Sequence, residues 1–102
     1  MAKRSVVWTE TSVRQRRLIL EYWSVHNRST IYSKKLIKLI ASRIKIILKH
    51  PDSFKMADFP ETRESAMGHF SIFYQVTDKQ LIITAFWDNR QDPKQLLKML
   101  TD

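Results

Sequence analysis

The chain has 102 residues, of which 43% are hydrophobic, and it contains one glycine and three prolines. This composition is typical of one globular domain with a modest core, so we expect a single domain over residues 1–102 and exclude a disordered or repetitive chain. The formal net charge is +8, which indicates either an acidic partner, such as nucleic acid, the ribosome, an anionic membrane surface or an acidic protein, or simply a solvated positive surface.

The sequence gives no sign of a metal site, a cofactor site or a membrane segment. It has no cysteine, and its histidines, at positions 26, 50 and 69, lack ligand spacing. Charged residues interrupt the longest apolar-rich stretch, 36–48, and the basic N-terminus is not followed by an apolar run. We therefore expect a cytoplasmic protein without metal, cofactor or membrane span.

The first quarter of the chain predicts a strand followed by a helix. Residues 3–9 are rich in β-branched and aromatic side chains, which favours a strand. Thr9 can cap a helix over about 10–26, because a threonine hydroxyl accepts a hydrogen bond from a free amide at the helix start. The expected apolar face of this helix comprises Val13, Ile19, Leu20 and Trp23, with the small Ser12 beside them.

A second helix is predicted from a cap at Ser29 or Thr30 to His50, where Pro51 stops it. The short link favours an antiparallel helical hairpin. One broad face of the second helix is apolar, formed by Leu36, Ile37, Ile40, Ile44, Ile47 and Leu48. The opposite face carries a lysine stripe, which we define as Lys34, Lys38, Lys45 and Lys49. Arg43 projects from the apolar side, so we expect it to reach solvent along its stem or to pair with an acid such as Glu21.

The second half of the chain changes to a period of two. Residues 51–61 have no period and predict a loop, whereas 62–67, 70–76 and 81–87 predict strands, with a tight turn at Gly68-His69. The run 81–87 is almost continuously apolar, which is typical of a central strand covered on both faces. Asp92 and Pro93 predict the start of a short terminal helix.

The predicted order is therefore β-α-α-β-β-β, with a short helix at the end. This order favours an α+β fold in which a small, mainly antiparallel sheet packs against an antiparallel helical hairpin.

Several short stretches add to this order. They are Trp8, Ser12, "EYW" at 21–23, Pro51, Arg63, "HFSIFYQV" at 69–76 and "FWDNRQDP" at 86–93. With the length and the basic charge, they make the chain resemble the RelE/ParE superfamily of toxins from type II toxin–antitoxin systems, over nearly its whole length.

The resemblance implies a cognate antitoxin that wraps a helix or an extended arm around the toxin and sets its oligomeric state. An apolar groove along the helical hairpin, together with the positive charge, fits an acidic amphipathic segment of such a partner.

The closing motif and the long hairpin resemble the ParE branch, whose members bind and poison DNA gyrase. On this reading the chain inhibits growth by binding its target. Target- or antitoxin-binding residues would be Arg90, Asn89, Trp23 and the lysine stripe.

The alternative is a RelE-like, metal-free endonuclease that cleaves mRNA on the ribosome. The basic residues of RelE-type strands fall on Ser71, Thr62 and Glu64 in this chain, and only Arg90 keeps a basic residue.

If the chain were nevertheless a nuclease, its catalytic residues would be His69, Arg90 and Arg63. Histidine is the side chain best suited to acid–base work near neutral pH, and we expect His69 to lie near Arg63.

A third class is a non-toxic module that binds RNA or the ribosome. It would need an exposed aromatic platform on which bases stack, and Phe73 with Phe86 on the adjacent strand would supply it.

Overall fold

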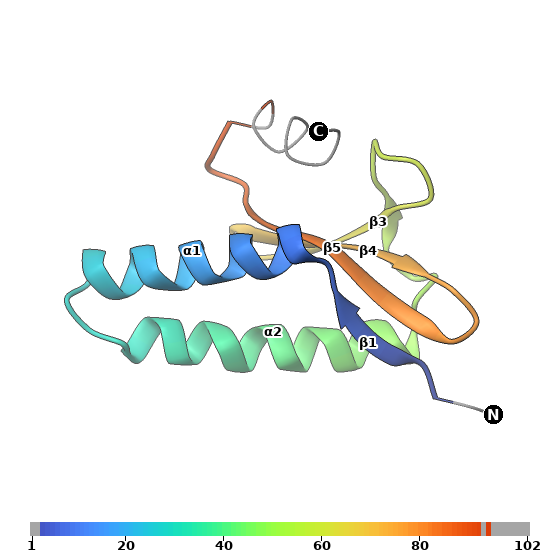
Figure 1. The fold of residues 1–102 in the computed structure, drawn as a ribbon, viewed down its shortest axis with the longest axis horizontal. Helices are drawn as coiled ribbons and strands as arrows, with labels where there is room; N and C mark the ends of the chain where they lie inside the picture. The colour runs from blue at the N-terminus through green and yellow to red at the C-terminus, as the bar shows by residue number, and fades with distance from the viewer. Residues whose placement is uncertain (1–2, 93, 95–102) are drawn as a thin grey trace.

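The computed structural model describes residues 3–92 and 94. Its elements are β1 (Ser5–Trp8), α1 (Glu10–His26), α2 (Ile31–Lys49), β2 (Lys55–Met56), β3 (Arg63–Met67), β4 (Phe70–Val76) and β5 (Gln80–Asp88). The two helices run antiparallel to each other and cover one face of the sheet (Figure 1). The α+β class and the predicted element order are therefore confirmed.

The five strands form one sheet in the order β1-β5-β4-β3-β2. β1 pairs with β5 in parallel, and the other three pairings are antiparallel. The prediction of a mainly antiparallel sheet is confirmed, and β5 is a central strand.

Thr9 ties the start of α1 to the sheet. Its Oγ1 accepts a hydrogen bond from the amide of Ser12 (3.2 Å), as predicted for a helix cap. The amide of Thr9 donates to the carbonyl of Ile83 (3.0 Å) on β5. One residue thus ends a strand, starts a helix and fixes the helix against the central strand.

The apolar faces of the two helices pack on β4 and β5. The buried residues of this core are Ile19, Leu36, Ile40, Ile47, Phe70, Ile72, Tyr74, Leu81, Ile83 and Phe86. On the opposite face of the sheet, Ala57 and Phe59 cover Phe73, Ala85 and Trp87. β5 is therefore covered on both faces, as its continuous apolar run predicted.

A bulge at Thr84 explains how β5 serves both faces. Phe73 pairs with Ala85 while the next residue, Tyr74, pairs with Ile83, so Thr84 is an extra residue in the ladder. The alternation of side chains shifts at that point. Ile83 and Phe86 consequently both face the helices, which strict alternation would forbid.

Some sequence expectations need correction. Val13 and Ile37, predicted on apolar faces, are 37% and 50% exposed. The Nη1 of Arg43 donates to Ser65 Oγ (3.0 Å) and to the carbonyl of Ala66 on β3, and it does not pair with Glu21. An arginine beside a sheet edge satisfies its donors on the nearest backbone and hydroxyl oxygens.

Two further expectations concern loops and caps. The predicted loop 51–61 contains the two-residue strand β2, which is too short to show a period. Thr30 makes no side-chain cap bond, and Ser29 Oγ accepts from the amide of Ile31 instead (3.2 Å). The predicted terminal helix lies outside the described residues, apart from an amide of Lys94 that donates to Asp92 Oδ1 (2.9 Å).

Candidate functional site

The end of β5 and the turn after it form the most structured polar feature of the described chain, which we call the β5 lip (residues 88–91). Arg90 donates from Nε to Asp88 Oδ1 (2.8 Å) and from Nη2 to Asp88 Oδ2 (2.7 Å). The amide of Arg90 donates to the same Oδ1 (3.0 Å). This bidentate pairing, which we call the Asp88–Arg90 clamp, fixes the guanidinium plane. The Nη1 of Arg90 takes no part in the clamp.

Aromatic rings hold the other side of the guanidinium. The Arg90 Cζ lies 4.8 Å from the ring centroid of Trp23 on α1 and 5.7 Å from that of Phe70 on β4. Trp23 contacts Tyr22 and Tyr32 edge-on, with centroids 5.1 Å and 5.4 Å apart. Arg90 is thus oriented by an acid in its plane and by aromatic faces above it.

The clamp shifts the titration of both partners. Burial by itself would raise the pKa of Asp88, but hydrogen bonds from the side chain and amide of Arg90, with the charges of Arg90 and His69, outweigh burial and lower it. The hydrogen bond to Asp88 raises the pKa of Arg90. The pair is therefore ionised near neutral pH, which suits a preformed charged surface.

A groove of about 550 Å³ runs between α1 and the β5 lip. Its lining residues are Gln15, Leu18, Ile19, Tyr22, Trp23, Trp87, Asp88, Arg90 and Gln91. Leu18 and Tyr22 are 53% and 57% exposed. The groove combines exposed apolar side chains with one oriented guanidinium, which is the composition of a protein-binding surface.

Sequence reasoning predicted Arg90, Asn89 and Trp23 as binding residues but missed most of the groove. Gln15 is buried, and its Oε1 accepts from the amide of Phe86 (2.9 Å), so it supports the β5 edge beyond the last residue of β1. Leu18 and Tyr22 stand outside the predicted apolar face of α1. The sequence signal for this groove was the presence of large apolar residues, Leu18 and Tyr22, outside the face of α1 that packs on the core.

Asn89 belongs to a second polar network, on the sheet face opposite the helices. Its Nδ2 donates to Ser71 Oγ (2.8 Å), and Ser71 Oγ donates to Glu64 Oε2 (2.6 Å). Glu64 Oε1 lies 3.5 Å from Lys55 Nζ. The chain of contacts connects the β5 lip across β4 and β3 to β2.

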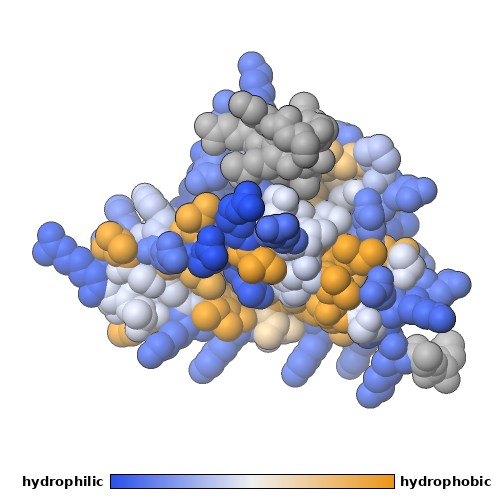
Figure 2. Space-filling view, in the orientation of Figure 1, coloured by the Kyte–Doolittle hydropathy of each residue, from blue (hydrophilic) through white to orange (hydrophobic). Residues whose placement is uncertain are grey.

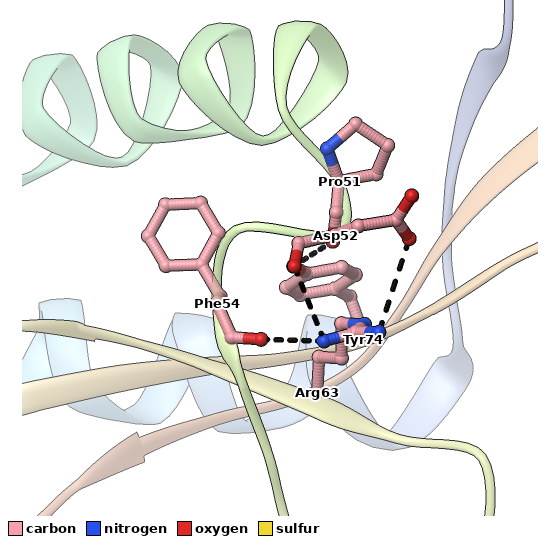
Figure 3. Close-up of polar contacts among 5 residues, drawn as sticks. All are labelled: Pro51, Asp52, Phe54, Arg63 and Tyr74. Carbon is pink, nitrogen blue, oxygen red and sulfur yellow. Dashed lines mark hydrogen bonds and ion pairs between the residues drawn. The ribbon is translucent and has the colours of Figure 1, made fainter.

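Arg63, Tyr74 and Asp52 form a separate cluster at the far end of β3 (Figure 3). Arg63 Nη1 donates to the carbonyl of Phe54 (2.7 Å), and its Nη2 lies 3.9 Å from Asp52 Oδ1. The Tyr74 hydroxyl donates to the carbonyl of Pro51 (2.7 Å). Burial raises the pKa of Tyr74 to about 12, against the opposing charge of Arg63. These contacts fasten the loop after α2 to the sheet.

The three predicted catalytic residues do not all lie together, because Arg63 lies at the opposite end of β3 from His69 and the β5 lip. Met67 pairs with Phe70 at the hairpin turn, whereas Arg63 pairs with Tyr74 at the opposite end of β3. His69 lies in that turn, so the expectation that it lies near Arg63 is wrong. His69 is instead next to the β5 lip, where its carbonyl accepts from the amide of Asn89 (2.7 Å).

A second apolar groove, which we call the hairpin groove, lies between β1, α1 and α2. It has a volume of about 420 Å³ and is lined by Trp8, Arg16, Leu20, Ile37, Ile40, Ala41 and Ile44. The Cζ of Arg16 stands 4.3 Å from the ring centroid of Trp8. A cation beside an apolar groove suits an amphipathic segment with acidic residues.

The lysine stripe is fully on the solvent side of α2, as predicted, because all four of its residues are exposed. Figure 2 shows long hydrophilic side chains projecting from the lower edge of the molecule, along which α2 runs. None of the four lysines is among the residues that line the two grooves.

The described residues, 3–92 and 94, include neither a metal-binding cluster nor a helix suited to cross a membrane. They contain no group of three or more His, Asp or Glu side chains placed to hold a metal ion. Neither helix among them combines the length and apolarity that crossing a bilayer requires.

The aromatic platform expected for an RNA-binding module is absent from this part of the chain. Phe73 and Phe86 are 4% and 0% exposed, and they pack in clusters on opposite faces of the sheet. The covered strand predicted from the apolar run 81–87 accounts for this, because Ala57 and Phe59 cover Phe73 and the helix-side core encloses Phe86.

Comparisons with known proteins agree on one fold. The family model described as "ParE toxin of type II toxin-antitoxin system, parDE" matches residues 6–93. No curated protein sequence matches the chain.

Three solved structures share the fold. A chain of the chromosomal ParDE system from P. aeruginosa is 17% identical with a TM-score of 0.69, over 82% of this chain and 94% of that chain. A chain of the E. coli DinJ-YafQ complex is 8% identical (TM-score 0.56, coverage 86% and 94%). YafQ from E. coli strain BL21(DE3) is 15% identical (TM-score 0.52, coverage 85% and 94%).

Proposed function

The chain belongs to the family of ParE toxins of type II toxin–antitoxin systems, and from this membership we propose that it inhibits growth by binding DNA gyrase. The proposal makes it a binding toxin and not a nuclease. The target is the one that the ParE resemblance implies.

The side chains of β3 and β4 supply the observation that supports this choice. Where RelE-type toxins carry basic residues, this chain has a carboxylate: Glu64 accepts from the buried Ser71 and pairs with Lys55. Thr62 is buried and donates to the carbonyl of Pro60 (2.9 Å). A carboxylate repels RNA phosphates, so this face is poorly suited to stabilise a cleaving phosphodiester.

Three of the remaining candidates for nuclease chemistry, Arg63, Tyr74 and Arg90, are already engaged. Arg63 is bonded to the carbonyl of Phe54, and the Tyr74 hydroxyl donates to Pro51. Asp88 neutralises much of the charge of Arg90. RNA cleavage needs a base, an acid and cations at one phosphate, and these groups lie at opposite ends of the sheet.

We place the target surface at the β5 lip and its groove. Arg90 presents one free edge of a fixed guanidinium, and Tyr22 and Leu18 present exposed apolar surface beside it. Tyrosine and arginine with a packed tryptophan are the residue types that dominate protein-binding energies. Asn89 holds the lip through Ser71.

We propose further that the cognate antitoxin binds in the hairpin groove. Trp8, Leu20 and Ile37 offer apolar area, and Arg16 offers a cation at its edge. An acidic amphipathic segment would bury its apolar side there and pair its carboxylates with Arg16.

RelE-like mRNA cleavage is the second candidate. One observation favours it: His69 is exposed and lies beside the β5 lip, where its carbonyl accepts from the amide of Asn89 (2.7 Å). A histidine next to a turn that carries an arginine supplies the residue types that acid–base chemistry at a phosphate needs.

An assay with purified components tests the proposal. The chain should inhibit supercoiling by gyrase, and Arg90→Ala should raise the inhibitory concentration at least about tenfold, as for a hot-spot arginine. Arg17→Ala is the matched control, because it removes an exposed arginine of α1 that lines neither groove.

The proposal would be contradicted if the parent chain and the Arg17→Ala control both failed to inhibit gyrase. Cleavage of ribosome-bound mRNA that is lost in His69→Ala would establish the second candidate in its place.

A further inference from the structure

The outer face of α2 has a charge pattern that the proposed function does not use. The helix Ile31–Lys49 contains five lysines and one arginine, and it contains no aspartate or glutamate. Arg43 turns inward and bonds to Ser65 on β3. The lysine stripe and the neighbouring Lys35 remain on the outer face, and all five are exposed.

These lysines have no acidic partners within the described part of the chain. The ion pairs found there involve Arg14, Lys55, Arg63 and Arg90, and none involves a lysine of α2. Unpaired charges of one sign on a single helix repel one another, so the face gains most from an external polyanion.

The stripe has the dimensions of a phosphate-binding surface. Lys34 and Lys49 are fifteen residues apart, which is about 22 Å along a helix. The four residues of the stripe lie within about 60° of one another around the helix axis, given ~100° per residue. A duplex of nucleic acid presents several phosphates of each strand over that length.

The composition of the face argues against a protein partner. Protein-binding surfaces are enriched in aromatic residues and arginine and depleted in lysine. The exposed apolar residues Ile31, Leu39 and Ile46 are separated along their row by Lys35 and Ser42, so they form no contiguous anchor.

A membrane surface and a single strand fit less well than a duplex. A membrane-binding helix buries its apolar face in lipid, but the apolar face of α2 is already buried against the sheet through Leu36, Ile40 and Ile47. Sequence-independent binding of single strands needs exposed aromatic rings for stacking, whereas the one aromatic residue of α2, Tyr32, packs edge-on against Trp23.

We propose that the lysine stripe of α2 is a sequence-independent binding surface for the phosphate backbone of double-stranded DNA. The inference goes beyond the proposed function and does not require gyrase as the target. If gyrase is the target, the stripe would let the toxin contact the DNA that gyrase holds while the β5 lip contacts the enzyme.

Fluorescence anisotropy with the purified full chain and a labelled random duplex of about 20 base pairs tests this. Four phosphate contacts predict a slope of log affinity against log salt close to −3.6, or a loss of about 150-fold between about 50 and 200 mM salt. Neutralising the stripe with Lys34→Gln, Lys38→Gln, Lys45→Gln and Lys49→Gln should flatten this slope and weaken binding at least about tenfold at low salt.

The matched control removes four other exposed charges, with Lys3→Gln, Arg17→Gln, Lys79→Gln and Lys94→Gln. Both variants remove four positive charges from a chain of net charge +8, so they separate the stripe from net charge. A third variant with arginine at the four stripe positions should keep both affinity and slope, because it keeps the charges.

The proposal stands if the control and the arginine variant bind within about threefold of the parent chain while the glutamine variant does not. Equal weakening of the control and glutamine variants would overturn it, as would absence of duplex binding by the parent chain. Competition by polyglutamate or anionic vesicles as strong as by unlabelled duplex would also overturn it, because the surface would then not select nucleic acid.

Discussion

At the scale of single residues, Arg90 shows how a short polar turn becomes an oriented surface. Asp88 ends the strand and accepts from both the amide and the guanidinium of Arg90, and the rings of Trp23 and Phe70 lie against the guanidinium. Asp88 and Asn89 also suit a turn by themselves. The same residues therefore close the strand and position the guanidinium, so structural and functional roles coincide.

The Asp88–Arg90 clamp predicts a defined dependence of stability on pH. Because the folded pKa of Asp88 is lowered, the clamp stabilises fully above the ordinary value of 3.8 and loses its effect as pH falls through the folded pKa. Asp88→Asn should cost about 1 kcal/mol at neutral pH, since Arg90 is half exposed and screened by water. Urea denaturation should show this difference near pH 7 and its progressive loss as pH falls below 3.8. A difference that stays constant as pH falls would contradict the clamp.

Tyr74 gives the opposite pH dependence and separates stability from function. Tyr74→Phe leaves the carbonyl of Pro51 without its donor, which should cost about 1–2 kcal/mol. Because burial raises the pKa of Tyr74 to about 12, this contribution is present below the unfolded value of 10.0 and is lost as pH rises toward 12. Denaturation at pH 7 should detect the loss, and inhibition of gyrase per folded molecule should be unchanged. Loss of inhibition in a fully folded Tyr74→Phe variant would assign the hydroxyl a functional role.

The roles of some residues could be predicted from their neighbours in the sequence, whereas the hydrogen-bond partners of others could not. Thr9 and Pro51 act on their nearest neighbours in the chain, so their roles could be predicted from the sequence. The partner of Arg43 is 22 residues away on β3, and the amide that Gln15 accepts from is 71 residues away on β5. Nothing in a local pattern selects one such partner over another.

At the scale of elements, the two helices differ in what they leave exposed. α1 contributes Leu18 and Tyr22 to the groove at the β5 lip, and α2 contributes Ile37 to the hairpin groove and the lysines to solvent. The hairpin therefore separates three surfaces of different chemistry. We propose that they contact the target, the antitoxin and DNA respectively.

Substitutions on α2 test the antitoxin surface. Ile37→Asp places a carboxylate in the hairpin groove and should weaken binding of the acidic antitoxin at least about tenfold, through lost apolar area and like-charge repulsion. Leu39→Asp is the matched control: Leu39 is 44% exposed, against 50% for Ile37, and does not line the groove. Titration calorimetry with the antitoxin should show the loss for Ile37→Asp alone; equal losses in both variants would place the antitoxin elsewhere.

Elements were predictable where a pattern repeats over several residues. α1, α2, β4 and β5 span enough residues to show their periods, and all four were predicted within one or two residues. β2 has two residues and no period, and the bulge at Thr84 follows from pairing with β4. The groove between α1 and the β5 lip is formed by two segments that are far apart in the sequence. Its shape depends on their tertiary contact, which neither segment reveals by itself.

At the scale of the whole molecule, the fold keeps Arg63 and Tyr74 at one end of β3 and β4, away from His69 and Arg90 at the other end. Arg63 and His69 are separated by the length of β3. Arg63 is held by the loop after α2, and Arg90 is held by Asp88. The same fold gathers exposed apolar and charged groups into separate surfaces. The central claim is therefore that this family member acts by binding.

Pulse-labelling after tightly controlled induction in a bacterial host tests that claim most directly, with DNA synthesis and protein synthesis followed separately. The account predicts that DNA synthesis stops first while translation continues, and that Arg90→Ala relieves the block while Arg17→Ala does not. Protein synthesis stopping first, with His69→Ala relieving the block, would contradict the account and establish RNA cleavage on the same fold.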